Sequence, residues 1–215
     1  MVITLEYWKY IWQKARHSHP LRLVVDGLWK MGISVRPFYV FQEGLSDMNI
    51  SEWYDKFDGY KLGFLELQDM EEVSRIPFRN DSSLEQLSLR LREGKRCLGM
   101  KYRGKLVAFT WCDFNRFDFE NYCFDLSKDE AYLFDAYTLE PYRGKGIAPY
   151  LRDQIYRELN LLGKKRLYSV SDCFNTPALK FKMKLNAKII ELGLFVELFG
   201  KWRFGRIIKK YEAAK

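Results

Sequence analysis

The sequence predicts an α/β (α+β) domain that follows an N-terminal helical extension. The length of 215 residues, with 47% hydrophobic and 30% charged side chains, suits one globular domain with a short appendage. From about residue 60, strand and helix patterns alternate in the order β-α-α-β-β-β-α-β-α-β-β, whereas the earlier residues show helical spacing. We therefore divide the chain into an extension, residues 1–57, and a main domain, residues 58–215.

The extension contains two patterns of helical periodicity. One helix is expected to start at Pro20 and to end at Gly32, and a weaker pattern lies in residues 5–15. Residues 35–41 have the composition of a strand, which would anchor the extension to the main domain. The mixture of tryptophans with lysines and arginines leaves two interpretations open: helices that pack on the core, which we favour, or helices that rest on an anionic bilayer.

The main domain begins with a strand pattern over residues 61–67. Two capping-box patterns, Asp69 with Glu72 and Ser82 with Glu85, predict the starts of two helices, and Gly94 predicts the end of the second. Residues 97–102 and 106–111 are rich in strand-forming residues and are separated by a short turn that contains glycine. We expect these two runs to form a β-hairpin.

Aromatic and acidic residues alternate in residues 113–129. This segment carries five aromatic side chains: Phe114, Phe117, Phe119, Tyr122 and Phe124. They suit a long hairpin that packs its aromatic rings, which we favour slightly, or an acceptor site for a cationic or sugar-like amine.

The second half of the domain continues the alternation. A strand over residues 132–139 precedes a helix whose apolar face begins at Ile147 and which stops at Gly163. A strand over 167–171 and a helix over 176–185, opened by Pro177, follow. Residues 187–199 and 202–208 then predict a final hairpin that turns at Gly200.

Composition excludes several classes of protein. The formal net charge of +8 suits phosphate-bearing ligands, anionic membranes or nucleic acid without choosing among them. Four well-separated cysteines form no zinc or disulfide pattern, and the two histidines, His17 and His19, argue against a Ser-His-Asp triad and against a metal site. We expect a cytoplasmic protein without a metal or a nucleic-acid partner, because signal-peptide, membrane-spanning and basic-aromatic stacking patterns are missing.

Residues 140–148 (EPYRGKGIA) connect a predicted strand to a predicted helix. Glycines at this position let the backbone approach a phosphate closely, and the helix dipole adds to the charges of Arg143 and Lys145. Lys145 suits either a phosphate contact or a solvated charge. Neither a Walker loop nor a dinucleotide-binding G-x-G-x-x-G fits, so the segment predicts a different anion cradle.

At this segment the sequence resembles the GNAT superfamily of N-acyltransferases. The signature [QR]-x-x-G-x-[GA] is matched by Arg143, Gly146 and Ala148, and the segments YRGKLVAF and NTPALKFKMKLNA stand in family order. The resemblance covers about residues 60–210. It implies a mixed, V-shaped sheet flanked by helices, in which the fourth and fifth strands splay apart and admit the pantetheine arm of acyl-CoA.

The resemblance also implies a cofactor site. The backbone of Tyr137, Thr138 and Leu139 would pair with the pantetheine. The pyrophosphate would be held by N–H groups of six consecutive residues: Arg143, Gly144, Lys145, Gly146, Ile147 and Ala148. Asn175 would cap its helix, the safer interpretation, and could also reach the pantetheine amides.

Two catalytic residues are proposed on the same basis. Asp135, placed by a period of two on one face with Leu133, Tyr137 and Leu139, would hold the acceptor amine or relay its proton. The alternatives are Glu130 acting through water, and a purely structural Asp135 bonded to a neighbouring segment.

The sequence departs from the family pattern at the position of the residue that usually donates a proton to the leaving thiolate. The usual helix tyrosine is Lys182 here, and the usual Gly-Phe reads Asn186-Ala187. Tyr168 is our candidate donor; Ser169, Ser171 and an unassisted departure of the thiolate remain alternatives.

These residues predict an acyl-CoA-dependent N-acyltransferase, most simply an acetyltransferase. A primary amine of a small molecule or amino sugar would attack the thioester directly in a ternary complex, with acetyl-CoA or another acyl-CoA as co-substrate. Two alternatives stay open: donors such as acyl carrier protein or long-chain acyl-CoA, and a non-catalytic module that binds CoA or an anionic surface. The protein is expected to be a monomer or homodimer, and the extension could bring it to the membrane periphery.

Overall fold

The structure is a computed structural model, and it describes residues 27–28, 30–44, 56–77, 79 and 82–211. The helix expected over residues 5–15 lies outside the described residues, as does the first part of the helix expected from Pro20 to Gly32. Of that second helix, residues 27, 28 and 30 are helical and a turn at residues 31–32 follows. The tryptophans of the extension, on which the membrane interpretation depends, also lie outside the described residues and stay untested.

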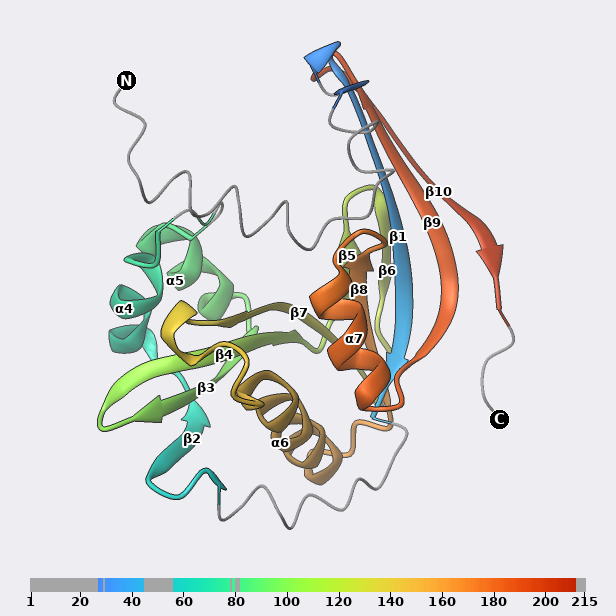
Figure 1. The fold of residues 1–215 in the computed structure, drawn as a ribbon. Coiled ribbons are helices and arrows are strands. Elements are labelled where there is room, and N and C mark those ends of the chain that lie inside the picture. The colour runs from blue at the N-terminus through green and yellow to red at the C-terminus, as the bar shows by residue number, and fades with distance from the viewer. Residues whose placement is uncertain (1–26, 29, 45–55, 78, 80–81, 212–215) are drawn as a thin grey trace, which may run out of the picture.

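A mixed sheet of eight strands forms the centre of the molecule, in the order β10-β9-β1-β8-β7-β4-β3-β2 (Figure 1). Among the strand pairs of the described residues, only β7 and β8 run parallel. The strands are β1 (Ile33–Glu43), β2 (Tyr60–Phe64), β3 (Arg96–Tyr102), β4 (Lys105–Asp113), β7 (Glu130–Thr138), β8 (Arg166–Asp172), β9 (Lys188–Leu198) and β10 (Trp202–Lys210).

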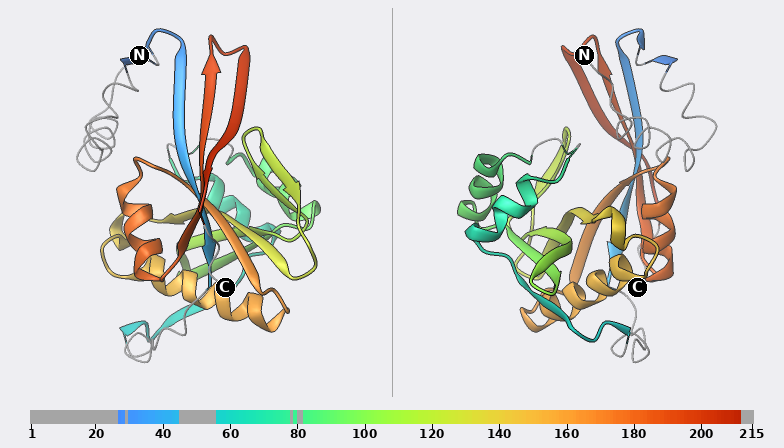
Figure 2. Two further views of the ribbon diagram at one scale, coloured as in Figure 1. Left: turned by 90° about the vertical axis from the view of Figure 1, so that its right-hand side faces the viewer. Right: turned by 60° about the vertical axis from the view of Figure 1, so that its left-hand side comes forward.

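The sheet divides between β7 and β8. These strands pair over four residues only, Glu130 to Leu133 against Arg166 to Ser169, and separate beyond them. Figures 1 and 2 show the resulting V, with β1, β8, β9 and β10 in one arm and β2, β3, β4 and β7 in the other. The predicted mixed, V-shaped architecture is therefore confirmed.

Helices cover both faces of the arm that holds β7. On one face lie η1 (Leu67–Asp69), α4 (Met70–Ser74) and α5 (Leu84–Arg92), which bury Met70, Val73 and Leu87 against β3 and β4. On the other face α6 (Ile147–Leu161) packs its apolar stripe against β3, β4 and β7. The short η2 (Glu140–Tyr142) joins β7 to α6, and α7 (Thr176–Lys184) follows β8.

Strand β1 lies inside the sheet, between β9 and β8. The strand expected over residues 35–41 is present and longer, with Phe38, Val40 and Phe41 almost fully buried. Residues 33–43 thus belong to the sheet of the main domain, although the sequence placed them in a helical extension. Phe38 and Val40 pack in one core cluster with Phe117, Tyr132 and Phe195. The boundary at residue 57 itself stays a prediction.

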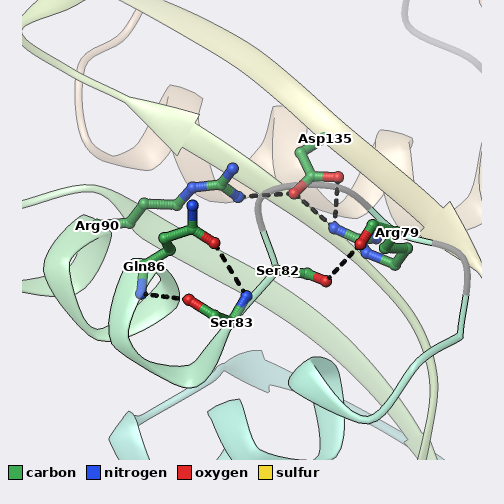
Figure 3. A network of polar contacts seen from close by, with 6 residues as sticks. All are labelled: Arg79, Ser82, Ser83, Gln86, Arg90 and Asp135. Atoms are coloured by element: carbon green, nitrogen blue, oxygen red, sulfur yellow. Dashed lines mark hydrogen bonds and ion pairs between the residues drawn. The ribbon is translucent and has the colours of Figure 1, made fainter.

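Both predicted capping boxes are misplaced. The box of α5 joins Ser83 to Gln86, one residue later than expected, and the Ser82 hydroxyl instead donates to the carbonyl of Arg79 (Figure 3). Asp69 makes no side-chain cap for α4. Its carboxylate instead accepts from the Glu66 N–H at 3.0 Å, within the capping box of η1, and from Lys101 on β3.

The aromatic segment forms a separate two-stranded hairpin, β5 (Arg116–Phe119) and β6 (Tyr122–Asp125). Phe117 is fully buried, with its ring 4.7 Å from that of Phe124 and 4.5 Å from that of Tyr132 on β7. The Tyr122 hydroxyl donates to Glu191 on β9. The interpretation as a hairpin that packs its aromatics is confirmed.

Strand β10 forms one edge of the sheet and is exposed along nearly all its length, including Trp202 and Phe204. Basic side chains along it discourage pairing with another edge. Within the described part of the chain, no helix has both the length and the apolar character needed to cross a membrane.

Candidate active site

A β-bulge interrupts β7 next to the division of the sheet. The register between β4 and β7 shifts between Phe109 and Trp111, so that two residues of β7, Asp135 and Ala136, lie opposite the single Thr110. Asp135 has φ = 46°, in the left-handed region. The bulge bends β7 away from β8 at the point where their pairing ends.

The bulge also reverses the alternation of side chains. Leu133 packs in the cluster that contains α6, whereas Tyr137 and Leu139 pack in the cluster that contains α4 and α5. The expectation that Leu133, Asp135, Tyr137 and Leu139 share one face is wrong. A period of two cannot survive an inserted residue.

A cavity of about 60 Å³ lies between the separated part of β7 and the helices α6 and α7. Its lining comes from four elements: Phe109, Thr110, Ala136, Tyr137, Thr138, Ala148, Leu151, Arg152 and Phe181. Tyr137, Thr138 and Ala148 were predicted from the sequence as cofactor-binding residues. The structure brings these three together on the cavity wall.

A larger open hollow, about 670 Å³, lies elsewhere, between η1, α4 and α5. Its lining includes Glu66 and Glu71 and no basic side chain. An acidic lining disfavours an anionic cofactor. The smaller cavity and the glycine loop beside it are therefore the candidate site.

The glycine loop carries the geometry of an anion cradle. Gly144 and Gly146 have φ of 76° and 85°, which side chains with a Cβ rarely adopt, and Gly146 is the N-cap of the 15-residue helix α6. Arg143 is exposed and donates from Nε to the Thr138 carbonyl at 3.0 Å. Lys145 lies over the ring of Tyr142, 5.3 Å from its centroid.

A further cation that the sequence did not predict, Lys56, lies next to this loop. A Cβ added to Gly146 would lie 3.5 Å from the Lys56 Nζ. Lys56 stands in an acidic stretch of sequence, where local charge predicts the opposite potential. Only the fold places it beside Arg143 and Lys145. Binding of a pyrophosphate by the predicted backbone N–H groups, from Arg143 to Ala148, stays a prediction.

Asp135 is held by two arginines (Figure 3). Both of its carboxylate oxygens accept from Arg79 Nη2 at 2.7 Å, and Oδ2 also accepts from Arg90 Nη1 at 2.7 Å. The guanidinium of Arg79 stacks on Phe109, 4.7 Å from the ring centroid, and that of Arg90 on Trp111 at 5.3 Å. Asp135 is thus bonded to neighbouring segments, as the structural alternative expected. A role of Asp135 in proton transfer stays a prediction.

Glu43 on β1 is the centre of a buried polar cluster that the sequence did not predict. It accepts from Tyr156 at 2.5 Å and from Ser169, and lies 3.4 Å from Arg152 Nε and 3.5 Å from Lys182 Nζ. Burial alone would raise the pKa of Glu43, but the charges of Arg152 and Lys182 and the two hydrogen bonds outweigh it and lower this pKa to about 2. Glu43 is therefore a buried anion.

Lys182 occupies the place of the usual tyrosine, and it points into this cluster. Its ammonium donates to Ser169 Oγ at 2.6 Å and to the Val170 carbonyl at 3.0 Å, besides its ion pair with Glu43. Burial lowers the pKa of Lys182 to about 8, against the opposing effect of Glu43. All three N–H groups of the ammonium thus have acceptors within the cluster.

Tyr168 does not line the cavity. Its hydroxyl donates to Glu130 at 2.9 Å, and its ring packs with Phe117 and Phe124 of the β5–β6 hairpin. Burial, followed by the bond to Glu130, raises the pKa of Tyr168 to about 12. The sequence-based role of Tyr168 as proton donor stays a prediction, as does that of Glu130 acting through water.

Asn175 caps α7, where its Oδ1 accepts from the Ala178 N–H at 3.3 Å. The capping interpretation is confirmed, and contact with pantetheine stays a prediction. Among the described residues, no group of three or more His, Cys, Asp or Glu side chains is arranged to hold a metal ion.

The chain matches a known protein family. The family model for the Acetyltransferase (GNAT) family matches residues 41–186, a match that begins within β1 and ahead of the resemblance placed at residue 60. A search of curated protein sequences finds no match.

Three solved structures share the fold. A Drosophila protein from a structural genomics consortium has 16% identity and a TM-score of 0.54 over 86% of this chain and 59% of its own. A putative GNAT acetyltransferase from Novosphingobium aromaticivorans has 15% identity and a TM-score of 0.56, over 78% of this chain and 66% of its own. A GCN5-related N-acetyltransferase-like protein from Streptococcus suis has 15% identity and a TM-score of 0.52, over 81% and 66%. The chain thus spans less than two thirds of each of these structures.

Four findings point to the same family: the V-shaped sheet, the bulge beside its division, the glycine loop at the N-terminus of α6 and the family match over most of the chain. The chain belongs to the GNAT acetyltransferase family.

Proposed function

We propose that the protein is an acyl-CoA-dependent N-acyltransferase, most simply an acetyltransferase, acting in the cytoplasm on a primary amine of a small molecule or amino sugar. The observation that carries this proposal is the cavity between the separated part of β7 and α6, next to the glycine loop. An anion cradle next to a cavity beside a free stretch of strand suits the phosphates and the arm of coenzyme A.

The arm of the cofactor would bind as an additional strand. Because β8 pairs with β7 only as far as Leu133, the following residues of β7 present backbone groups toward the gap. Amides of pantetheine can satisfy such groups as a peptide does at a sheet edge. Tyr137, Thr138 and Leu139 are the residues proposed to make this contact.

The reaction needs a neutral amine close to the thioester. The amine nitrogen attacks the carbonyl carbon, a C–N bond forms, and the C–S bond breaks with its electron pair on sulfur. The proton lost by nitrogen passes to a base. Asp135 and its two arginines lie at the bulge, and we propose that this carboxylate binds the acceptor ammonium or relays its proton.

Acetyl-CoA is the simplest donor for this reaction. Long-chain acyl-CoA and acyl carrier protein are the competing donors, and a direct binding comparison distinguishes the three.

Calorimetric titration with acetyl-CoA, palmitoyl-CoA and acetylated acyl carrier protein tests the proposal. We expect acetyl-CoA to bind with a dissociation constant in the micromolar range, about −8 kcal/mol, and the other two to bind much more weakly. Release of free thiol in the presence of a panel of primary amines then reports transfer. Binding of none of the three would reject the proposal, and binding without transfer to any amine would favour the non-catalytic alternative.

A further inference from the structure

Two polar side chains on the wall of the cavity have no hydrogen-bond partner for one of their atoms. Within the described part of the chain, five buried side-chain nitrogen or oxygen atoms lack a partner, and two of them, Thr110 Oγ1 and Arg152 Nη1, belong to residues that line this cavity. Arg152 is 3% exposed. A buried guanidinium N–H without an acceptor costs free energy, so its retention at a cavity indicates a ligand.

The charges around Arg152 do not balance. Glu43 supplies one negative charge, while Arg152 and Lys182 supply two positive charges in contact with it. The other polar groups bonded to Glu43, Tyr156 and Ser169, are neutral hydroxyls. The cluster thus carries an excess of one positive charge in a region shielded from water, where an opposite charge interacts strongly.

Of the two cations, Arg152 is the one with a nitrogen left to donate to a ligand. The Lys182 ammonium already has three acceptors. Arg152 binds Glu43 through Nε, and its Nη1 remains unbonded at the cavity. The excess charge is therefore presented to the cavity through the guanidinium of Arg152.

The place of Arg152 along α6 indicates which part of the donor it would meet. It follows Ala148 by four residues, about 6 Å along the helix axis and away from the glycine loop. Its partner Glu43 lies opposite Leu167 on β8, in the segment where β7 and β8 are still paired. Arg152 thus stands toward the closed end of the V, beyond the part of the cavity nearest the pyrophosphate loop.

We propose that Arg152, assisted by the hydroxyl of Thr110, forms a subsite for a negatively charged group at the reacting end of the acyl-CoA donor. This inference rests on the proposed function. Two sources of the charge fit: the thiolate that leaves when the C–S bond breaks, or a carboxylate at the far end of a short acyl group. Arg152 stays protonated throughout and stabilises the anion electrostatically.

Binding measurements with the Arg152→Gln variant distinguish the two sources. The matched control is Arg157→Gln, a half-exposed arginine on the same helix that pairs with Asp153 and does not line the cavity. Glu43 keeps Lys182, Ser169 and Tyr156 in the variant, and circular dichroism checks that it folds. Arg152→Lys, which retains the charge, should recover part of the effect.

Four ligands are titrated at about pH 7.5, below the pKa of about 8 of Lys182, so that the ammonium stays charged. CoA is compared with desulfo-CoA, and succinyl-CoA with butyryl-CoA, which has the same number of acyl carbons without the carboxylate. A selective loss of at least about tenfold for CoA in Arg152→Gln supports the thiolate. The same loss confined to succinyl-CoA supports the carboxylate.

Equal affinities of wild type and Arg152→Gln for all four ligands, or an equal loss for all four, would overturn the anion subsite. If wild type binds none of them, the proposed function itself fails. The two failures are thus distinguishable.

Discussion

The ammonium of Lys182 on α7 lies 3.5 Å from the carboxylate of Glu43 on β1, and both side chains are almost inaccessible to solvent. This ion pair links β1 to α7. The sequence placed β1 in the extension, and α7 is the helix on which the family resemblance places a tyrosine. The lysine therefore has a structural partner, and residues 33–43 are required for the interior of the acyltransferase fold.

The Glu43→Gln variant should be strongly destabilised. Without the carboxylate, two buried cations, Arg152 and Lys182, lose their shared anion, at a cost of about 3–5 kcal/mol in the free energy of unfolding. Chemical denaturation measures this. Glu71→Gln, which removes one partner of the exposed ion pair between Glu71 and Arg75, should change stability by less than about 0.5 kcal/mol. Similar small effects for both variants would contradict a buried charge cluster.

Lys182 should make stability rise with pH above about 8. Its pKa is lowered to about 8 in the folded protein, from 10.5, so between these values the unfolded chain binds a proton that the folded chain has lost. The contribution of Lys182 to the free energy of unfolding then increases with pH, by about 3 kcal/mol at most.

In Lys182→Met this rise should be missing. The comparison is made from pH 7 to 10 and read from the difference between the two proteins, because the raised pKa values of Cys97, Cys112 and Cys173 lower the stability of both above about pH 9. A stability difference between wild type and Lys182→Met that does not depend on pH would show that Lys182 titrates normally.

Gly146→Asp should weaken binding of acetyl-CoA by at least about tenfold, a loss of about 1.4 kcal/mol. The substitution adds a negative charge beside the proposed pyrophosphate site and a Cβ at a φ of 85°. Gly163→Asp is the matched control, because Gly163 follows the opposite end of α6 with φ of 77° and has open space around it. It should suffer a similar backbone strain and keep its affinity. Equal affinities of Gly146→Asp and Gly163→Asp in calorimetry would refute the site.

Asp135→Asn should lower turnover while acetyl-CoA binding changes little. The amide keeps the volume of the side chain but removes the charge that holds Arg79 and Arg90, so stability should also fall by about 1–3 kcal/mol. Asp129→Asn, which removes the charge that pairs with the exposed Arg166, provides the control. Unchanged turnover of Asp135→Asn at every pH from about 6 to 9 would assign the role to another group.

Local patterns in the sequence determined much of this fold. The hairpin of β3 and β4, the helix α6 between Ile147 and Gly163 and the glycine loop before it depend on turn residues and apolar periodicity within a few neighbouring positions. The family resemblance rested on the same short segments. These features needed no knowledge of distant contacts.

Only the tertiary structure decided the surroundings of the site. The bulge at Asp135 depends on the register of β7 against β4. The burial of Lys182 depends on its ion pair with Glu43 on β1. Arg152 has a nitrogen, Nη1, without a hydrogen-bond partner because neighbouring elements close around it. In the sequence each of these charged residues has the pattern of a solvated side chain. Their environment is set by desolvation and by long-range partners, and a local pattern contains neither.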